Sequence, residues 1–578
     1  MNIAITGEGI VSAIGNNKEE VLLSLRKRQS GIGRIKYLRT IHEELPVGEV
    51  DMSNEEMRSL LGISLNGIVS RTTMMGILAV RQALDDAHIP TGKRVILVSG
   101  TTVGGMDVTE RCFKDINADV LRQHDGGNCT KAIARYFGGL FDDVTTISTA
   151  CSSAANAIML GARLIKEGLA DIVVAGGTEA LSKFHLNGFN SLMILDHERC
   201  RPFDADRNGL NLGEGAAYLV LESDDCAKGR NIHAWLTGYG NACDAFHQAA
   251  TSANGDGATI AMTEALEEAG LAPSDIQYVN AHGTGTVNND ESESNALKQV
   301  FGDSLPLVSS TKGFTGHATS AAGSIEAVIC LLAMRHNFVP ANIGWSTPMS
   351  GGIVPTLGAE NTSLEHVMCN AFGFGGNDTS LIFSKTPVER KGAAADHRAG
   401  SDPVEVSRVE LSTEEDLREL REYVKPLEAR RMGKLMRGAF LSSKKALEAA
   451  GIETPDAIII GTAYGCLENS EKLLVQIIEE GETAVKPTLF MQSTHNTIAG
   501  DLAIRMKCKG YNCTYTQCDR SLDWALLDAR MLLKSGKCKN VLVGLHDETA
   551  PIFAEIMGDG YDVKYVKSIA IVLTCGEL

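Results

Sequence analysis

The feature that most constrains the fold is an internal repeat, because the last part of the chain resembles the first ~220 residues and then stops. Four pairs of similar segments occur in the same order in both regions: Arg81–Ile89 with Lys444–Ile452, Ile96–Gly100 with Ala457–Gly461, the segments starting at Thr149 and Thr516, and the segments ending at Glu222 and Thr574. Convergence of two unrelated units rarely preserves such an order. The sequence therefore predicts a fold of two halves, present as one and a half copies.

In each copy, strand-like segments alternate with helix-like segments, which is typical of a layered α/β fold. The expected strands include Val95–Ser99, Val144–Ser148 and Asp171–Ala175. Helical spacing of apolar residues predicts helices over Thr72–Ala87 and Ser152–Gly168. The start of the chain, Met1 to Gly15, lacks the features of a signal peptide and is expected to be a first strand.

Composition excludes several classes of function. The chain has 54 basic and 72 acidic side chains and a formal charge of -18, so neither nucleic acid nor an anionic membrane is expected as the main partner. No apolar run approaches the ~20 residues that span a bilayer. The 14 cysteines form no C-x-x-C pair, which argues against a metal site and for reduced thiols in the cytoplasm.

Cys151 is the candidate nucleophile. It lies between an expected strand, Thr145–Thr149, and an expected helix from Ser152 onward. A thiol at a helix N-terminus is close to the positive end of the helix dipole, which predicts a favoured thiolate. Taken alone, a cysteine between small residues is more often a buried packing residue.

Three glycine-rich loops strengthen the functional interpretation. They read A-H-G-T-G-T from Ala281, K-G-F-T-G-H from Lys312 and N-A-F-G-F-G-G-N-D from Asn370. A single such histidine is often a turn residue, but two histidine loops and an aromatic glycine loop in one chain are improbable by chance.

With these loops, the chain resembles a β-ketoacyl-acyl-carrier-protein synthase of the elongating, two-histidine type from Met1 to about Ser384. The motifs that carry the resemblance are T-A-C-S-S, R-P-F-D-A-D-R-N-G, G-E-G-A, H-G-T-G-T, K-G-x-x-G-H-x-x-x-A-A-G-x-x-E and G-F-G-G, in this order. The resemblance implies an α/β, thiolase-like fold with five α-β-α-β-α layers, followed here by an additional half-thiolase unit. It also implies decarboxylative Claisen condensation of an acyl thioester with malonyl-acyl-carrier-protein.

The resemblance also implies a role for each matching residue. Cys151 would carry the acyl group, and His282 and His317 would stabilise the malonyl enolate as neutral N–H donors. Lys312 would lie behind the histidines, paired with Glu326. Phe374 would act as a gate, and its N–H would form the oxyanion hole together with the Cys151 N–H. Thr284 and Thr286 would hydrogen-bond the phosphopantetheine arm.

The same resemblance names the partners and one departure. The acyl carrier protein would bring both thioesters on its phosphopantetheine arm, and no bound cofactor or metal is needed. The carrier is acidic, so a local basic patch is expected, with Lys131 and Arg135 or Arg26–Arg28 as contributors. An inactive partner subunit would lack the cysteine, and a thiolase would carry a second one in the late glycine loop. Asp378 stands where the family usually has Asn. This leaves open the hydrogen bonding of the glycine-rich loop from Asn370, which carries the gate Phe374 and is called the gate loop below.

The half-copy resembles the truncated partner subunits of aryl polyene pathways. It ends before any histidine loop, and Cys518 falls at or within one residue of its nucleophile position. Half a fold would expose an apolar face and a strand edge, so it is expected to dock as a pseudo-dimer partner, in cis or in trans. Its segment Leu489–Ser493 would then close the acyl tunnel, with Phe490 and Ser493 setting chain length. Phe490→Ala would lengthen the products.

The domain division follows from the linker and the resemblance. The polar stretch Thr386–Pro403 lacks apolar periodicity. We expect a nucleophile half at 1–240, a two-histidine half at 241–385, a linker at 386–404 and the truncated half-domain at 405–578. Two other interpretations stay open: a housekeeping fatty acid synthase with a stabilising appendage, and a half-copy that docks other pathway enzymes. Acyl length and starter unit are not predicted.

Overall fold

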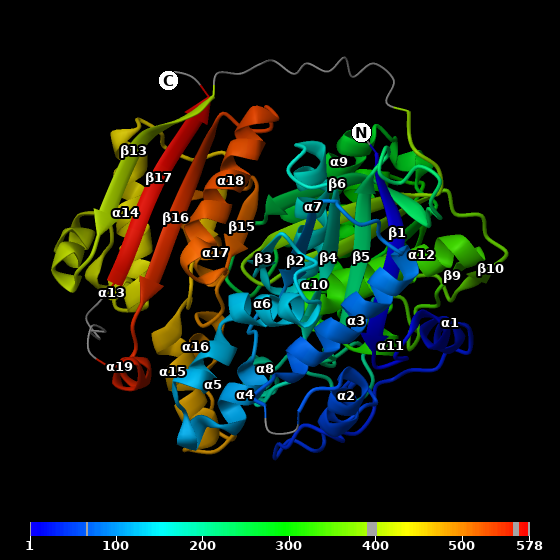
Figure 1. Cartoon of the computed structure of the whole chain (residues 1–578), viewed down its shortest axis with the longest axis horizontal. Helices are drawn as coiled ribbons and strands as arrows, with labels where there is room; N and C mark the ends of the chain where they lie inside the picture. The colour runs from blue at the N-terminus through cyan, green and yellow to red at the C-terminus, as the bar shows by residue number, and fades with distance from the viewer. Residues whose placement is uncertain (1, 65–66, 390–401, 559–565, 576–578) are drawn as a thin grey trace.

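A computed structural model describes residues 2–64, 67–389, 402–558 and 566–575. Their strands form one 15-stranded sheet in the order β13-β17-β16-β14-β15-β3-β2-β4-β5-β1-β6-β12-β11-β7-β8, with a separate pair β9 (Phe338–Val339) and β10 (Ala359–Glu360). The sheet divides into three five-stranded parts that correspond to the expected half-units. Figure 1 shows the appended part, in yellow to red, beside the first half.

The first half contributes β1 (Ile3–Ser12), β2 (Val95–Gly100), β3 (Asp143–Ile147), β4 (Ile172–Glu179) and β5 (Gly215–Ser223). The second half contributes β6 (Ala234–Cys243), β7 (Tyr278–Asn280), β8 (Leu307–Ser309), β11 (His366–Gly373) and β12 (Asn377–Ser384). The appended half contributes β13 (Pro403–Leu411), β14 (Ile458–Gly461), β15 (Asn512–Tyr515), β16 (Asn540–Glu548) and β17 (Val566–Cys575). The expected strands and the repeat of the first half are thereby confirmed.

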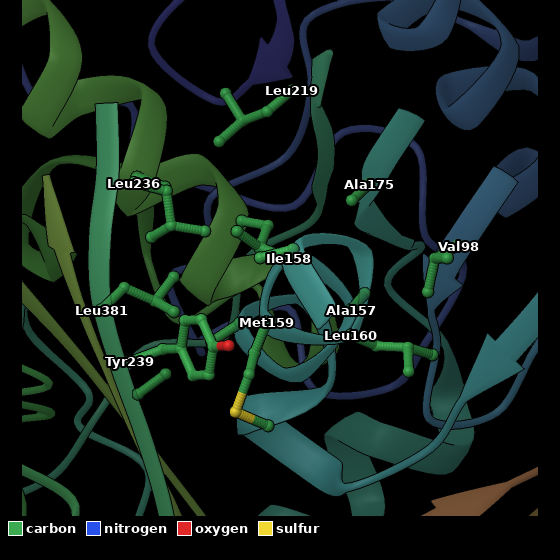
Figure 2. Packing of buried hydrophobic residues seen from close by; sticks show 14 of the residues in the cluster. Val98, Ala157, Ile158, Met159, Leu160, Ala175, Leu219, Leu236, Tyr239 and Leu381 are labelled. Carbon is green, nitrogen blue, oxygen red and sulfur yellow. The ribbon is translucent and has the colours of Figure 1, made fainter. Parts of the chain in front are cut away.

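Helices complete five layers in the synthase part. Helix α3 (Arg71–Ala87) covers the outer face of the five strands of the first half, and α9 (Asp256–Ala269) with α10 (Val287–Phe301) covers the outer face of the five strands of the second half. Between these two parts of the sheet lie α7 (Ser153–Lys166) and α12 (Ala322–His336). Figure 2 shows α7 in this middle layer, with Val98 and Ala175 on one side and Leu236 and Leu381 on the other. Small residues on α7 allow this close packing on both faces.

The appended half continues the sheet of the first half. β15 pairs antiparallel with β3 at Tyr515 and Ile147. The Ser148 N–H donates to Thr514 O at 2.9 Å, and the Thr516 N–H donates to Thr146 O at 3.0 Å. The strand edge of the half-copy is therefore covered within the same chain, which is the pseudo-dimer arrangement in cis.

A buried ion pair links equivalent helices of the two copies. Arg163 on α7 lies 2.5 Å from Asp528 on α18 (Ser521–Lys534), and Asp528 is fully buried. The Tyr511 hydroxyl donates to the second oxygen of Asp528 at 2.8 Å. Because both charges are paired and hydrogen-bonded, burial is tolerated here.

The other helices of the appended half pack on its sheet, on one another or on helices of the synthase part. They include α14 (Lys434–Ala449), α15 (Leu467–Ile478), α16 (Pro487–Met491), α17 (Thr497–Met506) and α19 (Pro551–Met557). The remaining helices of the synthase part are α1 (Lys18–Arg26), α2 (Asn54–Leu61), α4 (Met106–Arg111), α5 (Ala118–His124), α6 (Gly126–Tyr136), α8 (Lys183–Ser191) and α11 (Lys312–Thr315), with α13 (Pro426–Ala429) near the start of the appended half. Among the described residues, no helix is long and apolar enough to cross a bilayer.

One expected domain boundary falls inside a strand, and most of the expected linker cannot be compared with the structure. The boundary at residue 240 falls inside β6, which runs to Cys243. Most of the expected linker, residues 390–401, lies outside the described residues. Its last residues include Pro403, where β13 begins.

Candidate active site

Cys151 lies in a 3-10 turn, η2 (Ala150–Ser152), between β3 and α7. The turn is fixed by a hydrogen bond of 2.9 Å from the Thr149 N–H to the Ser153 hydroxyl oxygen. Ala150 adopts a φ of 52°, a conformation that side chains other than glycine rarely take. Such strain at a buried turn is typical of a functional position, and the turn holds Cys151 toward the protein interior.

Burial overturns the expected thiolate. The thiol is only 5 % exposed, and burial raises the pKa of Cys151 to about 12. The charge of Lys312 and the backbone N–H groups of Phe374 and Cys151 lower the pKa of the thiol, but by less than burial raises it. The prediction from the helix dipole was wrong because it ignored the depth of the turn.

The two histidine loops converge on this cysteine. His317 Nε2 lies 3.0 Å from Cys151 Sγ, and the rings of His282 and His317 are 5.2 Å apart. Burial holds the pKa of both histidines well below the ordinary value, and the charge of Lys312 lowers it further. Both imidazoles are therefore neutral near pH 7, with one N–H each to donate.

Lys312 lies behind the histidines, as expected. Its Nζ donates to Glu326 Oε1 at 2.6 Å and to the His282 carbonyl oxygen at 2.5 Å. Sequence reasoning missed Glu293 on α10, whose carboxylate accepts the N–H groups of His282 and Gly283 at 2.9 and 2.7 Å. Its position eleven residues after His282, on the helix that follows the loop, is the signal that marks it.

Two cavities meet at Cys151, and Phe374 lies between them. The larger, of about 300 Å³, has both histidines, Thr284 and Thr286 in its wall. The smaller, of about 30 Å³, is mostly apolar, and the appended half supplies part of its wall. Cys151, Phe189, Phe374 and Gly375 line both.

Phe490 reaches the smaller cavity from the appended half. Its ring packs 5.2 Å from Phe189, which in turn stacks 5.4 Å from Phe374. Gly188 allows this approach, because a Cβ there would lie 2.2 Å from the Phe490 ring. Ser493 does not line the cavity; its hydroxyl donates to the Phe490 carbonyl at 2.7 Å.

The nucleophile turn recurs in the second copy, shifted by one residue from the sequence pairing. Cys518 has a φ of 53°, like Ala150, and the Gln517 N–H donates to the Ser521 hydroxyl at 2.8 Å, as Thr149 does to Ser153. Cys518 therefore corresponds to Ala150, and Asp519 corresponds to Cys151. Gln517 in turn corresponds to Thr149.

Cys518 faces the first copy instead of a substrate cavity. Its thiol donates to Asp125 Oδ2 at 2.6 Å, and Lys131 Nζ lies 3.3 Å from the sulfur. Lys131 is thus half-buried between the copies and is poorly placed for the basic patch expected of it.

The comparisons agree with this geometry. The family descriptions "Beta-ketoacyl synthase, N-terminal domain" and "Beta-ketoacyl synthase, C-terminal domain" match residues 1–227 and 233–346, and a second description of the N-terminal domain matches residues 406–577. The chain is 33 % identical over 417 residues to "3-oxoacyl-[acyl-carrier-protein] synthase 2" of Vibrio cholerae serotype O1, covering 66 % of this chain and 99 % of that protein.

Solved structures, among them the two that follow, are also similar to this chain. "Ketosynthase (ApeO) in Complex with its Chain Length Factor (ApeC) from Xenorhabdus doucetiae" matches 67 % of this chain and 98 % of that chain, with a TM-score of 0.58 and 33 % identity. "PfaC Keto synthase-Chain length factor" matches 99 % of this chain and 78 % of that chain, with a TM-score of 0.78 and 16 % identity. The latter likeness concerns the fold alone, over both the synthase part and the appended half.

Proposed function

Since the chain belongs to the β-ketoacyl synthase family, we propose that it extends a Cys151-bound acyl group with malonyl-acyl-carrier-protein. It is an acyl-transferring enzyme of elongating condensation, in fatty acid or polyketide-like synthesis. The observation that carries the residue roles is the meeting of Cys151, His282 and His317 where the two cavities join.

The acyl transfer comes first. Cys151 Sγ attacks the thioester carbonyl, the bond to the carrier thiol breaks, and the thiol proton of Cys151 ends on the departing carrier thiol. The N–H groups of Cys151 and Phe374, which both face the sulfur, hold the oxyanion. The acyl chain then lies in the smaller, apolar cavity.

Condensation follows in the larger cavity. The malonyl thioester loses CO₂, and the enolate oxygen accepts N–H bonds from the neutral imidazoles of His282 and His317. The enolate carbon attacks the acyl carbonyl, Cys151 leaves as thiolate and takes up a proton, and a 3-oxoacyl thioester extended by two carbons remains on the carrier. Lys312 and Glu326 hold the His282 loop in place.

The carrier protein would present its phosphopantetheine arm along the larger cavity, where Thr284 and Thr286 lie 2.9 Å apart in the wall. A groove of about 990 Å³ on the appended half also includes Gln248, whose neighbours His247 and Ala249 line the larger cavity. Its basic side chains are Arg418, Arg421, Arg430, Arg431, Lys434, Arg437 and Lys472. On a chain with a net charge of -18, this groove is a better docking surface for an acidic carrier than Lys131. We also propose that the protein resides in the cytoplasm, where its cysteines would stay reduced.

The appended half would shape the product. Phe490 lines the small cavity and packs on Phe189, and one similar solved structure pairs a ketosynthase with a chain length factor. We propose a nucleophile half at 1–233, a two-histidine half at 234–385 and a shaping half at 405–578, because the expected boundary at 240 would divide β6 (Ala234–Cys243). A pathway of the aryl polyene type is favoured over housekeeping elongation, where the half-copy would only stabilise the fold.

Intact-protein mass after incubation with acyl-loaded carrier protein tests the assignment. We expect one acyl group on the wild type and on Cys518→Ala, and none on Cys151→Ala. Acylation of Cys151→Ala that disappears in Cys518→Ala would refute the assignment of the active copy.

A further inference from the structure

A side chain of the appended half donates a hydrogen bond directly to the gate loop. Asn496, the residue before α17, donates its amide to the Phe374 carbonyl oxygen at 2.7 Å. Asn496 is 3 % exposed and lines the small cavity. This bond crosses from the appended half to the residue whose N–H faces Cys151.

The gate loop needs such an anchor. Gly375 and Gly376 have φ values of 85° and 81°, in the left-handed region. Two consecutive glycines in this region leave the loop backbone with many accessible conformations, so its position must be set by neighbouring groups.

A second contact from α17 supports the first. The Gly375 N–H donates to the Gln248 carbonyl at 2.9 Å, and the Gln248 amide donates to Asp501 on α17 at 3.0 Å. The backbones also touch, because a Cβ on Gly500 would lie 2.9 Å from Gly375 O. Helix α17 therefore fixes the loop on both sides of the Phe374–Gly375 peptide bond.

The first copy has an equivalent residue that does a different task. Asp125 caps α6 as Asn496 precedes α17, and each follows a histidine. These histidines, His124 and His495, lie close enough that His495 adds to the effect of burial in lowering the pKa of His124 to about 4. Asp125 faces Cys518 and Asn496 faces Phe374, so the amide is found only at the position that faces Cys151.

We propose that Asn496 is a positioning residue that holds the Phe374 N–H in the oxyanion hole and the Phe374 ring on Phe189. The inference rests on the proposed function, and it makes the appended half a part of the catalytic apparatus. An aspartate at 496 has the same shape, but it sets a carboxylate oxygen against the Phe374 carbonyl oxygen. The loop is then repelled where the amide attracted it.

Reciprocal variants test the proposal. In single-turnover acylation from acyl-loaded carrier protein, we expect Asn496→Asp to slow acyl transfer to Cys151 by about 10-fold or more, since loss of one oxyanion-hole donor costs ~10²–10³ in rate. The KM for malonyl-carrier should change less than about 2-fold, because the histidine side of the site is intact. The matched control Asp125→Asn makes the opposite exchange at the equivalent position and should leave both values unchanged.

The outcomes separate the two proposals. If the wild type acquires no acyl group on Cys151, the proposed function fails. If the wild type is acylated and Asn496→Asp is acylated at the same rate, only the role of Asn496 is overturned. Should Asn496→Asp lack the circular dichroism of the wild type, Asn496→Ala carries the test, because it removes the donor without adding a charge. An equal loss of rate in Asp125→Asn would also overturn the role.

Discussion

Cys151 and Asp519 occupy equivalent positions in the two copies of the nucleophile turn. Each follows a residue with a φ of 52° or 53° and precedes by two residues a serine that caps the turn. Cys151 is buried among the histidines, whereas Asp519 is exposed to solvent. The second copy has kept the backbone of the turn and lost its chemistry.

Restoring the sulfur alone should therefore not restore a site. We expect Asp519→Cys to carry one acyl group per chain, as the wild type does, because position 519 is exposed to solvent and His282 and His317 lie around Cys151 instead. Intact-protein mass after acylation checks this result. The double variant Cys151→Ala/Asp519→Cys is the control, and any acyl group on it would contradict the prediction.

Phe490 should limit product length. Phe490→Leu shortens a side chain in the wall of a cavity of about 30 Å³, so the products should lengthen by at least one two-carbon unit, as read by mass spectrometry of the released acyl chains. Leucine is chosen because a buried Phe→Ala change costs about 3–5 kcal/mol. Phe440→Leu, in a separate cluster of the same half, is the control. An unchanged product distribution in Phe490→Leu would assign the limit elsewhere.

The buried ion pair between the copies should contribute more to the free energy of unfolding than an exposed ion pair at the same interface. Arg163→Met leaves the fully buried Asp528 unpaired, which we expect to lower the free energy of unfolding by about 3–5 kcal/mol. Arg520→Met breaks an exposed pair with Asp143 across the same interface, and should cost less than about 1 kcal/mol. Urea denaturation of both variants measures the difference. Equal losses would show that burial does not set the strength of this contact.

Asp378 should make stability depend on pH. Burial, then Asp244 and then Glu293, raises the pKa of Asp378 well above its ordinary value of 3.8. Above that value the folded state keeps a proton that the unfolded state releases, so stability is lost as pH rises. Relative to Asp378→Asn, the wild type should lose stability as the pH rises above about 5, with a slope of at most about 1.4 kcal/mol per pH unit.

Urea denaturation across this pH range measures the slope of each protein. Asn is the matched substitution, because it keeps the shape of the side chain and cannot titrate. Parallel stability curves for the two proteins would mean that Asp378 is ionised in the folded state.

Local sequence patterns identified the proposed catalytic side chains, but not their surroundings. Cys151, His282 and His317 lie in motifs whose spacing marks loops at strand ends, so local pattern sufficed for them. The pKa of Cys151 depends on burial by segments far apart in the chain, and the helix position alone gave the wrong direction. Asn496 acts on Phe374, 122 positions away, and such a contact follows from docking geometry that no local pattern encodes. The sequence pairing was shifted by one residue because Cys518 lies one position before Asp519, the residue equivalent to Cys151.

The pairing of β3 with β15 has a consequence for how this protein can change. In a homodimer, one substitution at the interface is made twice, once on each side of the two-fold axis. Here the two sides are separate stretches of one polypeptide, so each residue is inherited and altered independently. Asp125 and Asn496 differ at equivalent positions and have different partners. The fusion thus frees one side to serve a single reaction centre while the other becomes purely architectural.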